Sequence, residues 1–251
     1  IVEKSYTETE QIAGAFNQLL GKIKILDESR QEFVSNVSHE LKTPLTSMKV
    51  LADSLVQMPD VPVEYYREFM EDISAEIDRE NAIIADLLTM VKLDKTQAEM
   101  NIQPHNINEL LELILKRLRP IAEKQNIEMV LESFREVTAE VDEVKLTLAL
   151  TNFVENAIKY NKENGWVHVS LDANHKYFFV KVIDSGCGIP EEAQEHIFYR
   201  FYRVDKSHSR VIGGTGLGLA IAKQIMNQLG GNISITSEVG DGTEVIISIP
   251  L

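Results

Sequence analysis

Apolar side chains recur at every third or fourth residue along the N-terminal part of the chain. The steps alternate between four and three residues, which is the heptad pattern of a coiled coil or a helical bundle. A segment with two prolines, 58–62, divides this apolar seam into two long helices. The first seam contains Ile12, Phe16, Leu19, Ile23, Leu26, Arg30, Phe33, Val37, Leu41, Pro44, Met48, Leu51 and Leu55, and the second contains Tyr66, Met70, Ile73, Ile77, Glu80, Ile84, Leu87 and Val91.

Two antiparallel helices cannot bury both seams by themselves. We therefore predict an all-α dimeric four-helix bundle to which each chain contributes a two-helix hairpin. Packing of the seam against the rest of the chain is the alternative. In the first helix His39 lies two residues, or about 200°, beyond Val37, so it is expected to face away from the seam and into solvent.

Beyond a polar, aperiodic stretch from Asp94 to Gln103, helical and alternating patterns are mixed. Asn108 is placed to cap the first of the later helices. The strands are joined by hairpins rather than by regular βαβ units, so we predict an α/β sandwich with a mixed, largely antiparallel sheet. The patterns place helices at 108–125, 144–159 and 216–229, and strands at 128–132, 137–141, 166–171, 177–183, 233–237 and 244–249.

Composition limits the possible functions. The formal net charge of −14 disfavours nucleic acid as a ligand, because a phosphate backbone attracts Lys and Arg. The one cysteine, Cys187, allows no intrachain disulfide. No apolar run approaches the roughly 20 residues that span a bilayer. The chain opens within a helical pattern and without an initiator Met, so we expect it to be a fragment.

The glycine-rich segment Gly213–Leu219 leads directly into a predicted helix. Glycines let backbone N–H groups approach a polyphosphate, and a helix N-terminus adds partial positive charge. The segment lacks the Gly-Lys-Ser/Thr of a Walker A loop, and no strand abuts it as in a dinucleotide fold. Taken alone, it fits a phosphate site or a flexible loop equally well.

A carboxylate followed by glycines ends one predicted strand. Asp184 could accept a hydrogen bond from an exocyclic amine such as that of adenine, and Gly186 and Gly188 would let a flat base lie against the backbone. A tight turn with an Asp cap is the alternative.

Three polar side chains share one face of the helix predicted at 144–159. These are Asn152, Asn156 and Lys159, which are spaced by four and three residues. Two amide oxygens and an ammonium suit a hydrated Mg²⁺ ion that bridges phosphates. The alternative is a solvated polar face, although Asn gains nothing there by helix propensity.

These segments together resemble the motifs of sensor histidine kinases of two-component signalling. Six motifs occur in the order of that family, over essentially the whole chain. They are the phospho-acceptor box Ser38–Leu45, the asparagine box Asn152–Tyr160, the glycine boxes Asp184–Gly188, Gly214–Leu219 and Gly240–Thr243, and the phenylalanine box Phe198–Arg203. The opening Ile12–Asn17 is also similar to the end of a HAMP linker.

The resemblance implies that ATP phosphorylates His39 and that the phosphoryl group then passes to an aspartate of a response regulator. Glu40 would accept the ring proton of His39, and Arg203 would stabilise charge on the transferring group. Asn156, with Asn152, would bind Mg²⁺. Asp184 would hold the adenine amine, with Thr243 nearby through water. The other nucleotide-binding residues implied are Lys159, Tyr160, Gly186, Gly188, Gly214, Thr215, Gly216, Leu217 and Gly218, beside a mobile lid at 206–212.

Three residues refine this expectation. Asn152 stands where hydrolysing members of the wider superfamily carry a glutamate base, so ATP hydrolysis should be slow. In this family a hydroxyl at the place of Thr43 positions water for phosphatase activity; a hydroxyl that bonds back to its own helix is the alternative. Pro44 removes the N–H that would bond to the Glu40 carbonyl, so a bend or local loosening is expected beside His39.

The resemblance also implies a domain order. We expect the end of a HAMP linker and a signalling helix at 1–29, a dimerisation and phosphotransfer domain at 30–95, a linker at 96–103 and a catalytic ATP-binding domain at 104–251. The protein would be a homodimer and the cytoplasmic portion of a cell-membrane protein, meeting the membrane only through missing upstream segments. An ATP-hydrolysing machine of the same superfamily, a phosphatase-dominant protein and a non-catalytic dimeric signalling scaffold are the competing interpretations.

Overall fold

The computed structural model describes residues 2–57, 62–95, 100–204 and 214–251. The chain forms two compact units, Ile1–Glu80 and Asn81–Leu251. Their boundary lies inside the second long helix, so the last turns of that helix belong to the second unit.

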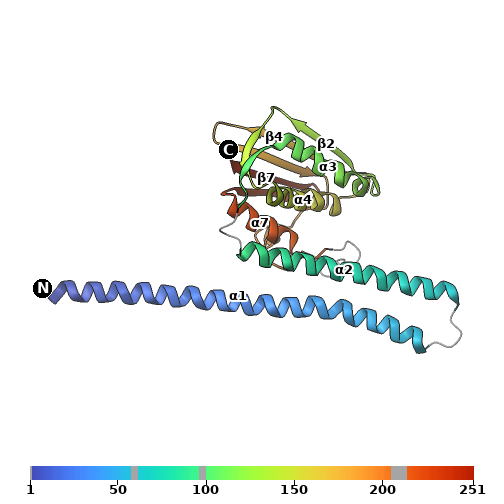
Figure 1. The fold of residues 1–251 in the computed structure, drawn as a ribbon, viewed down its shortest axis with the longest axis horizontal. Coiled ribbons are helices and arrows are strands. Elements are labelled where there is room, and N and C mark those ends of the chain that lie inside the picture. Colours follow the sequence, from blue (N-terminus) through green and yellow to red (C-terminus); the bar gives the residue numbers. More distant parts are fainter. Residues whose placement is uncertain (1, 58–61, 96–99, 205–213) are drawn as a thin grey trace. The chain divides into compact units, whose positions relative to one another are not determined.

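Two long helices, α1 (Val2–Gln57) and α2 (Val63–Lys95), form the predicted helical hairpin (Figure 1). The connection predicted to break the seam falls at 58–62, of which 58–61 lie outside the described residues. α1 continues as one helix through Pro44, whose side chain is buried. The seam is not covered within the single chain, because Ile12, Phe16 and Ile23 are each more than half exposed.

The second unit is a layered α/β domain. Three helices, α3 (Ile107–Glu123), α4 (Glu143–Lys159) and α7 (Gly218–Gln228), lie on one face of a five-stranded sheet (Figure 1). The strand order is β2-β4-β5-β7-β6; β2 and β4 pair in parallel and the other neighbours are antiparallel. The sheet is therefore mixed and largely antiparallel, as predicted. The strands are β2 (Glu128–Ser133), β4 (Trp166–Ala173), β5 (Tyr177–Asp184), β6 (Asn232–Glu238) and β7 (Gly242–Pro250).

Alternation along the central strand β5 separates the core from solvent. Phe178, Val180 and Val182 are buried beneath the helical layer, whereas Phe179 and Lys181 point to the other face and are half-buried. This period of two is what a strand covered on one face requires. It runs directly into Asp184, which keeps the buried orientation of its even-numbered neighbours.

A cap fixes the register of α4. The side chain of Asp142 accepts a hydrogen bond from the Lys145 N–H at 3.0 Å, which satisfies one of the free donors at the helix start. The helix is 17 residues long, and Tyr160 follows it as the C-cap. The cap thereby sets which α4 side chains lie beside α7 and which end in the region of the glycine loop.

Several predicted details were wrong. The N-cap of α3 is Asn106, whose side chain accepts from the N–H groups of Asn108 and Glu109, so Asn108 itself is helical. α7 begins at Gly218 rather than at Gly216, because Gly216 has a φ of +70° that no right-handed helix contains. Two short elements were missed, strand β1 (Gln103–Asn106), which pairs with β3 (Thr138–Val141), and helix α5 (Glu191–Gln194).

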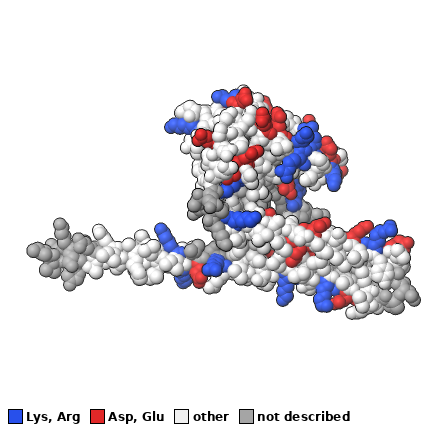
Figure 2. Space-filling view, viewed as in Figure 1, with Lys and Arg blue, Asp and Glu red and all other residues white. Residues whose placement is uncertain are grey.

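On the face drawn in Figure 2, basic side chains (blue) and acidic side chains (red) are interspersed. A nucleic-acid site calls for a continuous basic surface, and none is seen on that face. Among the described residues, none of the helices combines the length and the apolar character that crossing a bilayer requires.

Phe178 offers a test of the core. Replacing Phe178, which is 0% exposed, by Ala should lower the free energy of unfolding by about 3–5 kcal/mol, because it removes a large buried ring and leaves a cavity. Phe179→Ala is the matched control, since its ring lies on the open face of the same strand. Urea denaturation of both variants measures the difference. Equal losses would contradict the assigned orientation of β5.

Candidate functional site

Asp184 ends the central strand at the edge of the helical layer. Its side chain is 9% exposed, and its Oδ1 accepts a hydrogen bond from the Gly186 N–H at 2.8 Å. Burial raises the pKa of Asp184 above its ordinary value, while hydrogen bonds from the backbone of Gly186 and Thr243 oppose the rise. One carboxylate oxygen is thus held by the turn that follows.

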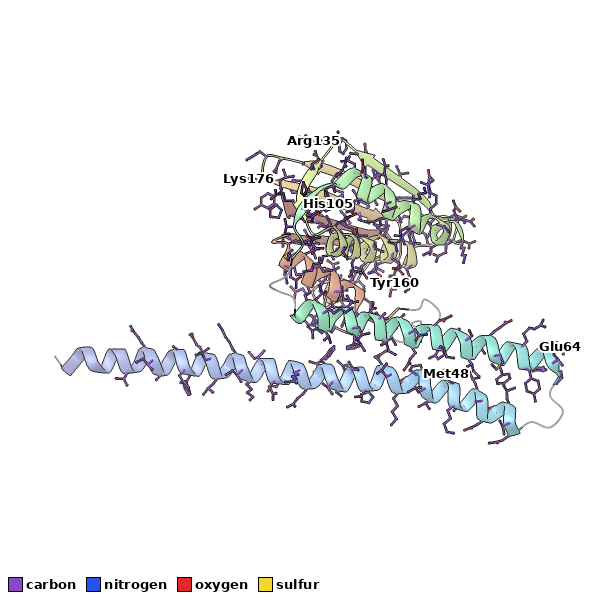
Figure 3. All side chains as sticks on the ribbon, viewed as in Figure 1. Met48, Glu64, His105, Arg135, Tyr160 and Lys176 are labelled. Carbon is purple, nitrogen blue, oxygen red and sulfur yellow. The ribbon has the colours of Figure 1, made fainter. Side chains whose placement is uncertain are left out.

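Glycines surround this carboxylate because backbone segments approach it too closely for side chains. A Cβ on Gly186 would lie 2.4 Å from the Tyr160 carbonyl oxygen, and one on Gly188, where φ is +70°, would lie 2.0 Å from the Glu238 carbonyl oxygen. Tyr160, labelled in Figure 3 at the end of α4, also accepts the Cys187 N–H at 3.0 Å. The Asp184 turn is therefore tied to the C-terminus of α4.

Thr243 lies opposite Asp184 in the β5–β7 register. Its hydroxyl is 2.9 Å from the Ser237 hydroxyl, which also bonds to the Gly242 carbonyl and accepts the Ile189 N–H. Ser237 was not among the residues predicted from the sequence. A serine at the end of an edge strand carries no local signal, since its partners are brought to it by the β6–β7 pairing and by the loop after β5.

The glycine loop 214–218 forms the N-terminus of α7. Gly214 and Gly216 have φ of +137° and +70°, conformations that favour glycine. The Thr215 hydroxyl accepts the Leu217 N–H at 3.1 Å, and the Leu217 side chain is fully buried. A Cβ on Gly218 would lie 2.3 Å from the Asn152 Oδ1. The loop thus packs tightly on α4, and Leu217 could meet a ligand only through its backbone.

Two cationic side chains converge on this loop. The Lys159 Nζ lies 3.1 Å from the position that a Cβ on Gly214 would take, and the Arg203 Nη1 donates to the Gly214 carbonyl at 2.8 Å. Residues 56 positions apart in sequence (Lys159 at the end of α4 and Thr215 in the loop) therefore share one small region with Arg203. A helix N-terminus with an ammonium and a guanidinium beside it is suited to polyphosphate.

The amide side chains of α4 fit a magnesium site in part. The Asn152 Nδ2 donates to the Leu148 carbonyl at 2.9 Å, which leaves its oxygen as an acceptor directed at the loop. Asn156 is half-buried one turn further along the same face. A Mg²⁺ ion bound through phosphates and water needs only one or two protein oxygens. The described residues contain no cluster of three His, Cys, Asp or Glu side chains that could hold a metal by themselves.

The phenylalanine box leads into the loop. The N–H of Phe201, a residue with a φ of +63°, donates to the Gly216 carbonyl at 2.9 Å, and the Lys223 Nζ lies 5.7 Å from the centre of the Phe198 ring. These contacts tie the box to the glycine loop and α7. The predicted lid at 206–212 lies outside the described residues.

His39 is exposed on α1, as predicted, and Glu40 beside it is half-buried. The Thr43 hydroxyl donates to the His39 carbonyl at 3.0 Å. This bond to the backbone of its own helix is the predicted alternative to a role of the Thr43 hydroxyl in positioning water. It holds the hydroxyl one turn from His39, on the same face of the helix.

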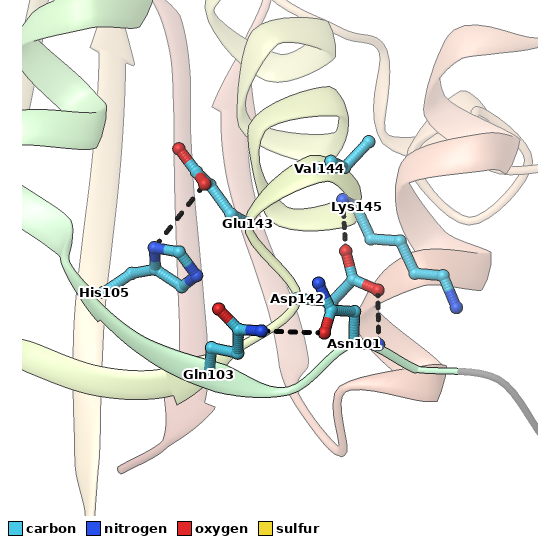
Figure 4. A pocket seen from close by; sticks show the side chains of 7 residues that line it. All are labelled: Asn101, Gln103, His105, Asp142, Glu143, Val144 and Lys145. Atoms are coloured by element: carbon cyan, nitrogen blue, oxygen red, sulfur yellow. Dashed lines mark hydrogen bonds and ion pairs between the residues drawn. The ribbon is translucent and has the colours of Figure 1, made fainter.

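A separate pocket of about 250 Å³ lies at the other end of α4 (Figure 4). The Asp142 carboxylate accepts the N–H groups of Asn101 and Lys145, and the His105 Nδ1 lies 3.5 Å from the Glu143 carboxylate. These contacts join β1 and the residues before it to the start of α4.

An exposed histidine on a helical hairpin, followed by an α/β domain with a glycine loop flanked by two cationic side chains, is the arrangement expected of a histidine kinase. Residues 29–96 match the His Kinase A (phospho-acceptor) domain, and residues 141–251 match the Histidine kinase-, DNA gyrase B-, and HSP90-like ATPase family. The chain belongs to the sensor histidine kinases and carries both domains of their kinase region.

Individual relatives agree with this. Sensor histidine kinase WalK of Bacillus subtilis is 37% identical over 228 residues, which cover 90% of this chain and 37% of WalK. Sensor-like histidine kinase SenX3 of Mycolicibacterium smegmatis is 34% identical over 225 residues, which cover 90% of this chain and 58% of SenX3. The chain thus spans between 37% and 58% of the length of these two curated relatives.

Solved structures of another histidine kinase, ThkA, are also similar. Its catalytic domain is 31% identical, with a TM-score of 0.54, and the match covers 60% of this chain and 96% of that domain. ThkA in complex with the response regulator protein TrrA matches at 26% identity with a TM-score of 0.70, covering 87% of this chain and 61% of the solved chain.

Gly242 and Gly240 test the close packing behind Asp184. Both have positive φ, +104° and +94°, but a Cβ on Gly242 would lie 2.0 Å from the Asp184 carbonyl oxygen, whereas one on Gly240 meets nothing within 4 Å. Gly242→Ala should therefore cost about 2 kcal/mol or more beyond the backbone strain that it shares with Gly240→Ala. Thermal and urea unfolding of the two variants measures the excess; equal stabilities would refute the packing.

The raised pKa of Asp184 predicts a pH dependence of stability. The folded protein binds this proton more tightly than the unfolded chain, so the free energy of unfolding should fall as pH rises from about 4, the ordinary Asp value, through the raised pKa. Asp184→Asn should remove that fall, and its stability relative to the parent should improve with pH across the window. Urea titrations from acid to neutral pH measure this, with the exposed Asp241→Asn as control. Parallel curves for the parent and Asp184→Asn would exclude the effect.

Proposed function

We propose that this chain is the kinase region of a two-component sensor, which binds ATP at loop 214–218 and transfers the γ-phosphoryl group to His39. The observation that carries the proposal is the convergence of Lys159 and Arg203 on the glycine loop, in a chain whose phospho-acceptor helix presents an exposed histidine. The domain division proposed is 1–29, 30–95, 96–103 and 104–251.

Different residues would bind the adenine, the phosphates and the Mg²⁺ ion. Asp184 would accept the adenine amine with its remaining carboxylate oxygen, and Thr243 would assist through water. The N–H groups of loop 214–218 would hold the phosphates together with Lys159, and Tyr160 would lie beside them. Asn156 and Asn152 would hold a Mg²⁺ ion, which would supply charge neutralisation between the phosphates.

In the transfer itself, one ring nitrogen of His39 attacks the γ-phosphorus while the bond from that phosphorus to the bridging oxygen breaks and ADP leaves. Glu40 accepts the proton of the other ring nitrogen, which keeps the attacking lone pair available. Arg203 stabilises negative charge on the transferring group. An amide at Asn152 cannot take a proton from water, so ATP is preserved for His39.

Further activities follow from the same proposal. The phosphoryl group would pass from His39 to an aspartate of a response regulator, consistent with the complex of ThkA with TrrA. Apolar side chains left exposed along α1 favour a homodimer through the helical bundle. The Thr43 hydroxyl, one turn from His39, favours an additional phosphatase activity towards that regulator. The protein would work on the cytoplasmic side of a cell membrane, attached through upstream segments.

The decisive assay is incubation with γ-labelled ATP and Mg²⁺. The parent chain should acquire label that is labile in acid and stable in alkali, His39→Gln should acquire none, and the exposed His175→Gln should be labelled like the parent. Nucleotide binding should persist in His39→Gln, because that residue takes no part in the ATP site. Label that survives in His39→Gln, or none in the parent despite bound ATP, would overturn the kinase assignment and favour a phosphatase-dominant protein or a scaffold.

A further inference from the structure

Asp86, on the part of α2 that belongs to the second compact unit, contacts the glycine loop. The Thr215 hydroxyl donates a hydrogen bond to the Asp86 Oδ2 at 2.5 Å, across 129 residues of sequence. Thr215 is the hydroxyl residue within the proposed phosphate loop. A carboxylate from α2 therefore lies where the proposed function places an anionic ligand.

The electrostatic surroundings of Asp86 are those of the phosphate site. Burial raises the pKa of Asp86, and the hydrogen bond from Thr215 and the charge of Lys159 oppose the rise. Lys159 is the same ammonium that lies beside Gly214. The carboxylate thus uses the hydroxyl and the cation that the phosphates would use, and two anions at one site repel each other strongly where water is excluded.

The rest of this α2 stretch is anchored to the same unit. Ile83, Met90 and Leu93 are 1%, 1% and 5% exposed, and the Gln228 Nε2 on α7 donates to the Leu93 carbonyl at 3.0 Å. Ile84 and Val91, on the apolar seam, remain 42% exposed. One face of residues 83–93 therefore packs in the catalytic unit, while the seam residues on the adjacent face stay partly exposed.

We propose that Asp86 is a built-in competitor of the ATP phosphates for loop 214–218, so that α2 attachment and nucleotide binding at this loop oppose each other. The proposal rests on the proposed function, because it takes the loop to be the ATP site. Attachment lowers the population of the binding-competent state and weakens the apparent affinity in proportion. Nucleotide, in turn, loosens residues 83–93 from the catalytic unit, since the coupling is reciprocal. A catalytic unit freed in this way by ATP is the one that can approach His39.

The test compares nucleotide affinities of the complete 251-residue chain. Asp86→Asn keeps the shape of the side chain and removes its charge, so its dissociation constant for a non-hydrolysable ATP analogue with Mg²⁺, measured by titration calorimetry, should fall by about tenfold. Asp78→Asn, the same change at an exposed position of α2, should bind like the parent. Equal or weaker binding by Asp86→Asn would overturn the competition.

Hydrogen exchange gives a second readout, on the parent chain and on Asp86→Asn. Saturating analogue should increase exchange across residues 83–93, and the increase should be absent in Asp86→Asn, where attachment no longer opposes the nucleotide. Unchanged exchange in the parent with analogue bound would refute the competition and leave the proposed function standing. Failure of the parent and of Asp86→Asn to bind the analogue at all would instead overturn the proposed function, and the competition with it.

Discussion

The carboxylate of Asp184 is held among backbone segments that approach one another too closely for any side chain larger than hydrogen. The end of β5, the C-terminus of α4 and the β6–β7 turn meet here, and Gly186, Gly188 and Gly242 are where they touch. The first consequence is geometric: a buried acceptor is fixed at a sheet edge with one oxygen already used by the Gly186 N–H. The second is electrostatic, because desolvation makes that charge costly unless a donor completes its hydrogen bonds.

This close backbone packing also positions α4 and the glycine loop 214–218, where the phosphates are proposed to bind. Tyr160 accepts the Cys187 N–H and also terminates α4, so the Asp184 turn is joined to the helix that carries Asn152, Asn156 and Lys159. Gly218 then packs directly on the Asn152 side chain, which brings the start of α7 to the same helix. In the proposed function, the residues for the base and those for its phosphates are therefore both positioned by α4.

The sequence predicted this arrangement where local pattern and motif coincide. Helix α4, strands β4 and β5 and the glycine loop follow from periodicity and from glycines at positions of close approach. Ser237 and Asp86 could not be predicted, because each has a partner far away in sequence: the Ile189 N–H in the loop after β5 for Ser237, and the Thr215 hydroxyl for Asp86. Strand β1 was missed for the same reason: its four residues, three of them polar and one a proline, become a strand only because β3 lies beside them. The cap at Asn106 rather than Asn108 was a local ambiguity between two residues of equal capping ability.

Helix α2 joins the two demands that a kinase region of this kind must reconcile. Its seam face carries Ile84 and Val91, which need a partner to be covered, whereas the adjacent face buries Ile83 and Met90 in the catalytic unit. If α2 always held the catalytic unit, the proposed phosphate loop could not reach an acceptor. If α2 never held it, the catalytic unit would not be restrained between turnovers. A single carboxylate at the contact resolves this, because the buried apolar residues provide attachment that is insensitive to nucleotide and Asp86 makes it sensitive. The strength of attachment and its response to ATP can therefore vary independently, through different residues on the same helical face.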